Sequence, residues 1–158
     1  MDELADRARA VIEDNLYMVL GTTEPEGAAR VSPVYFTQHE FRDFFWVSSP
    51  DAHHSRNVQA HPAVTAVIFD STLPPGQSAA VYLTGMANEV PPADLDEACA
   101  RAFANLKSTA RAFTPAELSG DAPLRLYRLH ATTHEVHVRG SDAAYGTGID
   151  SRCSVAIA

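Results

Sequence analysis

The first element that the hydrophobic pattern predicts is a helix at the start of the chain. Leu4, Ala8 and Ile12 recur at helical spacing behind Asp2, a residue type that often caps helices. Residues 1–14 are therefore expected to form an amphipathic N-terminal helix. Its apolar face must be covered, so we expect this helix to pack on the rest of the protein.

Three segments rich in β-branched and aromatic residues follow, and this composition is typical of strands. They are "LYMVLGTTE", "EGAARVSPVYFTQ" and "DFFWVSS", with hairpins expected at "TEPEGA" and "TQHEFRD". The strand pattern is broken from about residue 50 to residue 61, where a short helix is expected. The next segment, "AVTAVIFD", is apolar almost throughout and is predicted to be a strand buried on both faces.

Strand-like alternation returns after the Pro- and Gly-rich loop "STLPPGQS". The segment "AAVYLTGMANEV" places Val81 and Leu83 on one face and Tyr82 and Thr84 on the other. This pattern predicts a fifth strand with one face toward the core.

A longer helix is predicted over residues 91–113. Asp94 and Glu97 have the spacing of a capping box, in which the side chains at the helix start satisfy free backbone amides. Leu95 and Leu106 belong to a set of apolar residues at helical spacing. Among the predicted helices, this one has the most complete set of signals.

The end of the chain predicts one more strand and a tail. The strand covers roughly residues 124–138, with a bend expected near Thr132 and Thr133, and residues 140–158 are expected to be loop-like. Six antiparallel strands with helices between them favour a mainly β (α+β) fold, a small barrel with peripheral helices. The length of 158 residues fits a single domain, residues 1–158.

Charge and composition exclude several classes of partner. A net charge of −8 and a single lysine, Lys107, argue against nucleic acid, whose binding depends on many cationic contacts to phosphates. No apolar run approaches the roughly 20 residues of a membrane span, and the charged start is unlike a signal peptide, so a cytoplasmic location without a membrane is expected. Cys99 and Cys153 lack metal-type spacing and are expected to be unpaired thiols.

The familiar catalytic motifs and metal motifs do not occur. No Gly-rich phosphate loop is present, and "GTGID" follows no strand and opens no helix, so it is expected to belong to a flexible tail. The histidines do not form a metal set, because strand periodicity puts His134 and His137 on opposite faces. Ser55 beside His54 lacks the Gly-flanked turn that exposes a catalytic serine. No catalytic residue can be named from the sequence.

The most informative segment is "HHSRN", residues 53–57, which directly follows a strand end. Its imidazoles, hydroxyl, guanidinium and amide could satisfy most oxygens of one phosphate, with Arg56 as the permanent cation. If Asp51 caps this helix, its negative charge disfavours a phosphate at the helix start, so Ser55 and Arg56 would bind it further along. A solvated helix face remains an equal interpretation of this spacing.

The order of four segments resembles the pyridoxamine 5'-phosphate oxidase-like family of flavin-binding split β-barrels. They are "MVLGTTEPEGAARVSPVYF", "FFWVSS", "HHSRNVQAHPAVTAVIFD" and "AVYLTGMANEV", which together cover roughly residues 16–90. The resemblance implies a six-stranded split β-barrel and a homodimer that binds FMN at the subunit interface.

The resemblance also implies roles for the "HHSRN" segment. Asn57 matches the family's Asn, and His54 stands where the family often has a phosphate-binding Lys or Arg. Because His54 is expected to be mostly neutral at pH 7, Ser55 and Arg56 are expected to supply the main phosphate contacts.

The remaining cofactor residues implied by the resemblance lie on two predicted strands. The stretch at Val34 and Tyr35 matches the strand that runs along the flavin, and Trp46, Val47 and Ser48 match the strand under its ring and ribityl chain. Tyr35 and Trp46 would also suit an ordinary core position.

Three functions remain open at this stage. The first is an FMN-binding oxidoreductase that acts on an unidentified small molecule. The second is a reductase of the same fold that uses a deazaflavin coenzyme, although that polyanionic cofactor would favour a more basic groove; other relatives bind haem. The third is a flavin-binding or small-ligand-binding protein without turnover. In the enzyme that oxidises pyridoxamine phosphate, basic and aromatic residues of the C-terminal tail bind the substrate. The tail of this chain has only Arg152 and Tyr145 for such a role, which argues against oxidation of pyridoxamine phosphate itself.

Overall fold

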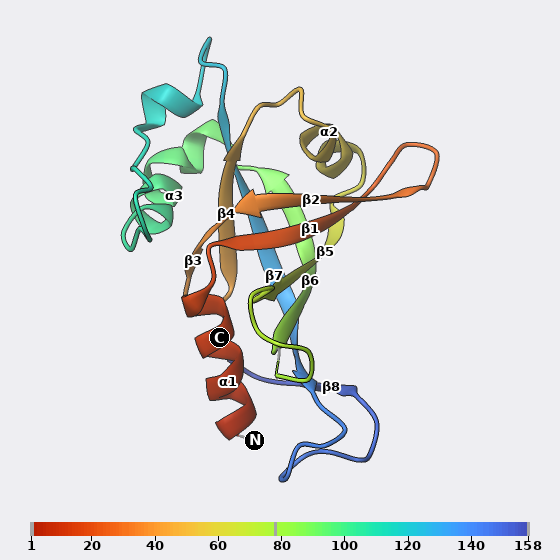
Figure 1. Ribbon diagram of the computed structural model, residues 1–158. Coiled ribbons are helices and arrows are strands. Elements are labelled where there is room, and N and C mark those ends of the chain that lie inside the picture. Colours follow the sequence, from red (N-terminus) through yellow and green to blue (C-terminus); the bar gives the residue numbers. More distant parts are fainter. Residues whose placement is uncertain (1, 78, 158) are drawn as a thin grey trace.

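Eight strands form one antiparallel sheet in the computed structural model, which describes residues 2–77 and 79–157 (Figure 1). The strands are β1 (Tyr17–Thr23), β2 (Ala29–Tyr35), β3 (Thr37–His39), β4 (Asp43–Ser48), β5 (Ala63–Phe69), β6 (Ala80–Glu89), β7 (Arg125–Val138) and β8 (Ser151–Ser154). The helices are α1 (Asp2–Asp14), α2 (His53–Ala60) and α3 (Leu95–Ala102), with short 3₁₀ helices η1 (Pro92–Asp94) and η2 (Pro115–Leu118).

The sheet curls because its two end strands are consecutive in the chain. The strand order is β2-β1-β5-β6-β7-β4-β3, and only Phe36 separates β2 from β3. The ends of the sheet therefore meet at Phe36, while the rest of β2 is not paired with β4. This half-barrel confirms the predicted split-barrel fold. The strands number eight rather than six, because the second predicted strand is divided at Phe36 and the tail adds β8.

Two helices cover the interior of the half-barrel at opposite ends of the sheet (Figure 1). Leu4, Ala8 and Ile12 of α1 and Val58 of α2 are buried in the same core cluster as the inward side chains of the strands. The predicted N-terminal helix is confirmed, and its apolar face packs as expected. The side chain of Asp2 lies outside the described part of the structure, so its capping role stays a prediction.

A second core cluster lies between α3 and the outer side of β4 and β7. It contains Phe45 of β4, Leu126 of β7 and Leu95 and Cys99 of α3. The other outer face, formed by β1, β2, β5 and β6, carries exposed apolar side chains such as Val31. One outer face of the sheet is therefore covered within the chain, and the other faces solvent.

The prediction that β5 is buried on both faces is wrong for the single chain. Its side chains alternate, with Val64 and Ile68 buried and Thr65 and Phe69 exposed. No helix of the described chain covers the outer face of this strand, so only its inner face enters the core.

The helix predicted over residues 91–113 is much shorter. It ends at Ala102, and Asp94 makes no capping hydrogen bond through its side chain. A capping box forms instead between Thr114 and Glu117, at the start of η2. The chain leaves the helix because the residues beyond Phe103 contact other parts of the fold, a tertiary effect that helical spacing does not reveal.

The predicted bend in the last strand is confirmed as a bulge in β7. Thr84 pairs with Thr133 and Gly85 pairs with Ala131, which leaves Thr132 without a cross-strand partner. A Cβ atom on Gly85 would lie 2.0 Å from the carbonyl oxygen of His130, so the close approach at the bulge requires glycine.

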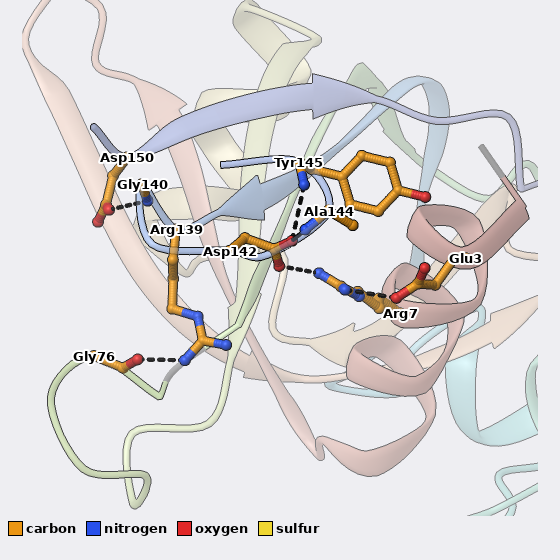
Figure 2. A network of polar contacts seen from close by, with 9 residues as sticks. All are labelled: Glu3, Arg7, Gly76, Arg139, Gly140, Asp142, Ala144, Tyr145 and Asp150. Atoms are coloured by element: carbon orange, nitrogen blue, oxygen red, sulfur yellow. Dashed lines mark hydrogen bonds and ion pairs between the residues drawn. The ribbon is translucent and has the colours of Figure 1, made fainter. Parts of the chain in front are cut away.

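The predicted loop-like tail is more ordered than expected. Residues 151–154 form β8 on the edge of β7, and Ile157 is buried in the main core. Before β8, the chain forms a turn that is fixed to α1 through the tail clasp, a set of contacts among Arg7, Asp142 and Tyr145 (Figure 2). "GTGID" belongs to this turn, so it is not a free loop.

Among the described helices, none combines the length and the apolar composition that a membrane span requires. The cytoplasmic location stays a prediction.

Candidate functional site

A cavity of about 530 Å³ lies at the seam of the split barrel, where β2 approaches β4. This volume falls within the roughly 300–1,000 Å³ that is usual for small-molecule and cofactor sites. We call it the seam cavity. It is lined by Pro33, Val34, Tyr35, Thr37, Phe45, Trp46, Val47, Ser48, His54, Phe103, Ala110, Arg111, Phe113, Leu124 and Leu126.

The strand β4 has a free edge at this cavity. Its pairing with β3 extends only from Asp43 to Phe45, while its other edge pairs with β7 as far as Ser48. Backbone amides and carbonyls from Trp46 to Ser48 therefore have no strand partner toward the cavity within the described chain. Such an edge offers hydrogen-bonding groups to a planar ligand beside apolar side chains.

Two buried polar atoms in the cavity walls have no hydrogen-bond partner among the described residues. They are Oγ1 of Thr37 and Nε1 of Trp46. Both side chains are at least 95% buried, and the Trp46 ring stacks on Tyr127 with centroids 5.7 Å apart. Unpaired buried polar atoms are costly and uncommon, and two others occur outside this cavity, Oγ of Ser55 and Nε of Arg128. Thr37 and Trp46 are the two of these residues that line the seam cavity.

A third polar position connects β4 with α2. The Ser48 hydroxyl and Nε2 of His54 lie 2.9 Å apart at the cavity wall. Burial, and to a smaller extent the charge of His53, lowers the pKa of His54 below its usual value. His54 is therefore mostly neutral near pH 7 in this state, and a bound anion beside it would raise that pKa.

Six of the nine cofactor-binding residues named from the sequence line the seam cavity together: Val34, Tyr35, Trp46, Val47, Ser48 and His54. They come from β2, β4 and α2, which the fold brings to one place. Their contact with a cofactor stays a prediction.

The other three predicted residues do not line this cavity. Ser55 is buried and lines a separate cavity of about 310 Å³ beside Tyr127. Arg56 is exposed, so it lies on a different face of α2 from Ser55. Asn57 is buried and contacts Thr22 of β1 at 3.0 Å, which joins α2 to the sheet. The side chains of "HHSRN" therefore do not face one common site, because the helix directs them to different parts of the fold.

Asp51 does not cap α2 as the sequence analysis considered. The residue at the cap position is Ala52, and no side chain caps the helix start. The backbone amide of Asp51 instead donates to the Ser49 hydroxyl at 3.1 Å, within the turn. Asp51 therefore gives no reason for a phosphate to avoid the start of α2.

The sequence analysis missed the wall formed by the segment after α3. Phe103, Ala110, Arg111 and Phe113 from this segment line the cavity. The rings of Phe103 and Phe113 lie 5.9 Å apart. The aromatic residues and the arginine were visible in the sequence, but the predicted long helix hid their arrangement.

Two histidines outside the cavity have structural partners. Nδ1 of His130 and the Asp43 carboxylate lie 2.8 Å apart, and Nε2 of His134 lies 2.6 Å from the Phe41 carbonyl oxygen. Within residues 2–77 and 79–157, no group of three or more His, Cys, Asp or Glu side chains could hold a metal ion. Cys99 and Cys153 are both free thiols, as predicted.

Comparison with protein families gives one match, which covers most of the chain. The model described as pyridoxamine 5'-phosphate oxidase matches residues 4–137. The chain belongs to the pyridoxamine 5'-phosphate oxidase family. The match includes most of α1, the residues that line the seam cavity and nearly all of β7, so the resemblance seen in the sequence is confirmed. A search of curated proteins finds no match.

Solved structures share the fold at low sequence identity. A haem-binding protein from Mycobacterium smegmatis has a TM-score of 0.67 and 20% identity, and the match covers 96% of this chain and 57% of that protein. A haem storage protein from Vibrio cholerae has a TM-score of 0.59 and 18% identity, with 92% and 98% covered. An F420 reductase has a TM-score of 0.55 and 17% identity, with 80% and 94% covered. At these identities the likeness establishes the split-barrel fold alone.

Proposed function

We propose that this protein binds FMN in the seam cavity and is a flavin-dependent oxidoreductase that acts on a small molecule. The observation that carries the proposal is that three features occur together in this cavity. Its walls are mostly apolar, its lining includes Thr37 and Trp46 with their unpartnered buried atoms, and the free edge of β4 lies beside it. An isoalloxazine ring needs a flat apolar slot with a few fixed hydrogen-bonding groups, and this cavity provides them.

The chain's own groups would hold and orient the cofactor. The β4 edge from Trp46 to Ser48 would face the ring system, and Ser48 with His54 would bind the phosphate. FMN supplies hydride transfer when it is bound, and the protein supplies orientation and the exclusion of water. Phe103 and Phe113 cover the apolar wall on the side of α3.

We extend the proposal to a homodimer in which a second copy covers the outer face of β1, β2, β5 and β6. Tyr17, Val31 and Met86 on this face are 59%, 70% and 49% exposed. β2 carries Val31 on this face and contributes Val34 and Tyr35 to the cavity, so a partner there would lie beside the cofactor site. The charged variant Val31→Asp is expected to be a monomer in analytical ultracentrifugation and to release FMN. A monomer that keeps full affinity for FMN would contradict this placement.

The first test of the cofactor is the visible spectrum of the freshly purified protein. After heat denaturation, the supernatant is run on a column beside FMN, FAD and a deazaflavin standard. Release of FMN supports the proposal. A haem spectrum would show that the cofactor is haem, and release of a deazaflavin would show that it is a deazaflavin instead of FMN. A colourless protein that also fails to bind added FMN would contradict the proposal of flavin binding.

A second test separates turnover from simple binding. The FMN-loaded protein is reduced with a nicotinamide donor and then mixed with candidate electron acceptors while the flavin absorbance is followed. Reoxidation by an organic acceptor faster than by oxygen alone supports an oxidoreductase. Flavin that binds tightly but exchanges electrons with no acceptor would favour the non-catalytic function.

A further inference from the structure

A second cavity of about 310 Å³, which we call the Ser55 cavity, lies between α2 and the strands β6 and β7. Trp46 of the seam cavity stacks on Tyr127 of the Ser55 cavity, with the two ring planes 16° apart, so the walls of the two cavities adjoin. Among the described residues, none lines both cavities, and the volume is at the lower end of the range for small-molecule sites. The Ser55 cavity is lined by Pro50, Ser55, Val58, Gln59, Pro62, Ala87, Asn88, Glu89 and Tyr127.

The Ser55 cavity has a buried floor and an exposed rim. Its floor is formed by four residues that are each at most 3% exposed, Ser55, Val58, Ala87 and Tyr127. Its rim is formed by four exposed residues, Pro50, Gln59, Pro62 and Glu89. A small molecule can therefore enter from solvent and reach groups that are buried in the free protein.

Two hydroxyl groups belong to this floor. Oγ of Ser55 is buried and has no hydrogen-bond partner among the described residues, although a serine within a helix often bonds to a carbonyl of the preceding turn. Burial raises the pKa of the Tyr127 phenol, so this group stays neutral at physiological pH. Both hydroxyls can accept a hydrogen bond from a ligand, and a partner for Ser55 would remove the cost of an unpaired buried group.

Glu89 is the charged residue of the rim, and its carboxylate is only partly engaged. Nε of Arg125 lies 3.4 Å from Oε1 of Glu89. Both Nη atoms of this arginine are taken up by backbone carbonyl oxygens, those of Gly120, Ala122 and Leu124. Oε2 of Glu89 has no partner within the described part of the chain, and no other charged residue described there lines the cavity. The rim therefore has an acceptor with a negative charge that is available to a ligand.

We propose that the Ser55 cavity is a second binding site, separate from the seam cavity, for a small apolar molecule that carries an ammonium group. An ammonium has three donors and no acceptor, and Ser55, Tyr127 and Glu89 all supply oxygens that can accept. The charge of Glu89 favours a cation over a neutral molecule of the same shape, and Val58 and Ala87 would contact the apolar body. The site does not depend on whether the seam cavity binds a flavin.

The test uses benzylamine and its neutral counterpart benzyl alcohol as probes, with Trp46 as the reporter. Trp46 is the single tryptophan of the chain and stacks on Tyr127, so its fluorescence is expected to change when a probe contacts the Tyr127 ring. The wild-type protein is expected to bind benzylamine roughly five- to tenfold more tightly than benzyl alcohol, as for a charge-assisted contact at a partly exposed carboxylate. Glu89→Gln should lose this preference.

Ser55→Ala tests the floor of the cavity. This variant should bind both probes several-fold more weakly, because it removes an oxygen that accepts a hydrogen bond from either probe. Its melting temperature should be unchanged or higher, because the lost hydroxyl has no partner among the described residues and alanine favours a helix.

Glu97→Gln is the matched control for Glu89→Gln. Glu97 is also exposed and pairs with an arginine, Arg101, but it does not line the Ser55 cavity. This variant should keep the wild-type preference for benzylamine. Thermal melting of all variants shows whether a loss of binding reflects unfolding.

Four outcomes would overturn the assignment of this site. The wild-type protein could show no preference for benzylamine, or Glu89→Gln could retain the preference. A marked fall in the melting temperature of Ser55→Ala would show that its hydroxyl already has a partner, such as water. Competition between benzylamine and FMN would place the probe in the seam cavity. Since the titrations also work without flavin, a protein that binds no FMN but shows the Glu89-dependent preference would reject only the proposed function.

Discussion

The seam cavity and the tail clasp differ in how their polar groups are satisfied. In the clasp, Arg7 donates to the Asp142 carboxylate at 2.5 Å, and the amides of Ala144 and Tyr145 donate to the same carboxylate at 3.0 Å (Figure 2). The Asp142 side chain is only 6% exposed. In the seam cavity, by contrast, the buried polar atoms of Thr37 and Trp46 have no partner among the described residues.

This difference separates groups that stabilise the fold from groups that are suited to a ligand. A buried polar atom with its partners in place contributes to stability, whereas one without a partner costs free energy until something binds it. The clasp should therefore respond to mutation in stability, and the cavity should respond in affinity.

Asp142→Ala should lower the melting temperature without changing the affinity for FMN. Removal of this carboxylate takes away the acceptor of Nη1 of Arg7 and of two backbone amides, and we expect a loss on the order of 5 °C. The matched control is Asp6→Ala, because Asp6 pairs with Arg9 at a largely exposed position. Differential scanning calorimetry measures both. Equal melting temperatures for the two variants would contradict a stabilising role for the clasp.

His54→Ala should weaken FMN binding roughly tenfold or more, since a hydrogen bond to a charged phosphate is lost. Arg56→Ala is the neighbouring control on α2. The sequence pattern predicts Arg56 as a main phosphate contact, but its exposed position outside the cavity predicts a small effect of this substitution. Flavin fluorescence titration with FMN and riboflavin measures both variants. A larger loss for Arg56→Ala would restore the original hypothesis.

Two buried threonines give a direct comparison between a satisfied and an unsatisfied hydroxyl. Thr22 and Thr37 are 4% and 5% exposed, but only Thr22 has a hydrogen-bond partner, Asn57. Thr22→Val should destabilise the fold by about 1–3 kcal/mol, because it leaves the amide of Asn57 short of a partner. Thr37→Val should leave stability nearly unchanged.

In cofactor binding, the larger effect is expected from the substitution of Thr37 and the smaller one from that of Thr22. Thr37→Val should raise the dissociation constant of FMN several-fold, and Thr22→Val should not. Urea unfolding and FMN titration test the two properties separately. A marked loss of stability in Thr37→Val would show that its hydroxyl already has a partner, such as water, in the free protein.

The smallest expected effect is a change of stability with pH in the acid range. The Arg7 guanidinium, followed by the amides of Tyr145 and Ala144, lowers the pKa of Asp142 to about 2. A lowered pKa in the folded state means that the charged form is stabilised by folding, so this stability is present above the unfolded value and is lost as pH falls. The melting-temperature gap between the wild-type protein and Asp142→Asn should narrow from about pH 4 to pH 2. A constant gap across this range would contradict the charge-based explanation.

The local pattern of hydrophobic residues was enough to predict most of the helices and strands. Alternation at Val81 and Leu83 identified β6 and its buried face, and helical spacing identified α1. The pattern failed for residues 91–113, because Lys107 of this segment contacts the carbonyls at the end of α1, a partner more than 90 residues away. It also failed for the tail, where pairing with β7 creates β8.

For the seam cavity, the order of segments in the sequence named residues of β2 and β4 but only part of the wall. Val34, Tyr35, Trp46 and Val47 line one cavity because β2 and β4 approach each other where the sheet closes at Phe36, and their contact with a cofactor stays a prediction. Arg111 could not be assigned to the wall, since its position depends on how residues 107–113 cross the fold.

The sequence by itself determined most of the strands, the first helix and the membership of a split-barrel family, because side-chain periodicity and the order of short segments reflect local geometry. The tertiary structure decided which polar groups share a surface. A helix turns successive side chains by about 100°, so the five residues of "HHSRN" could not all face one ligand. In the structure, His54 lines the seam cavity, Ser55 and Asn57 are buried elsewhere, and Arg56 is exposed. The permanently charged residue that lines the cavity is Arg111, which lies 57 residues after His54 in the sequence.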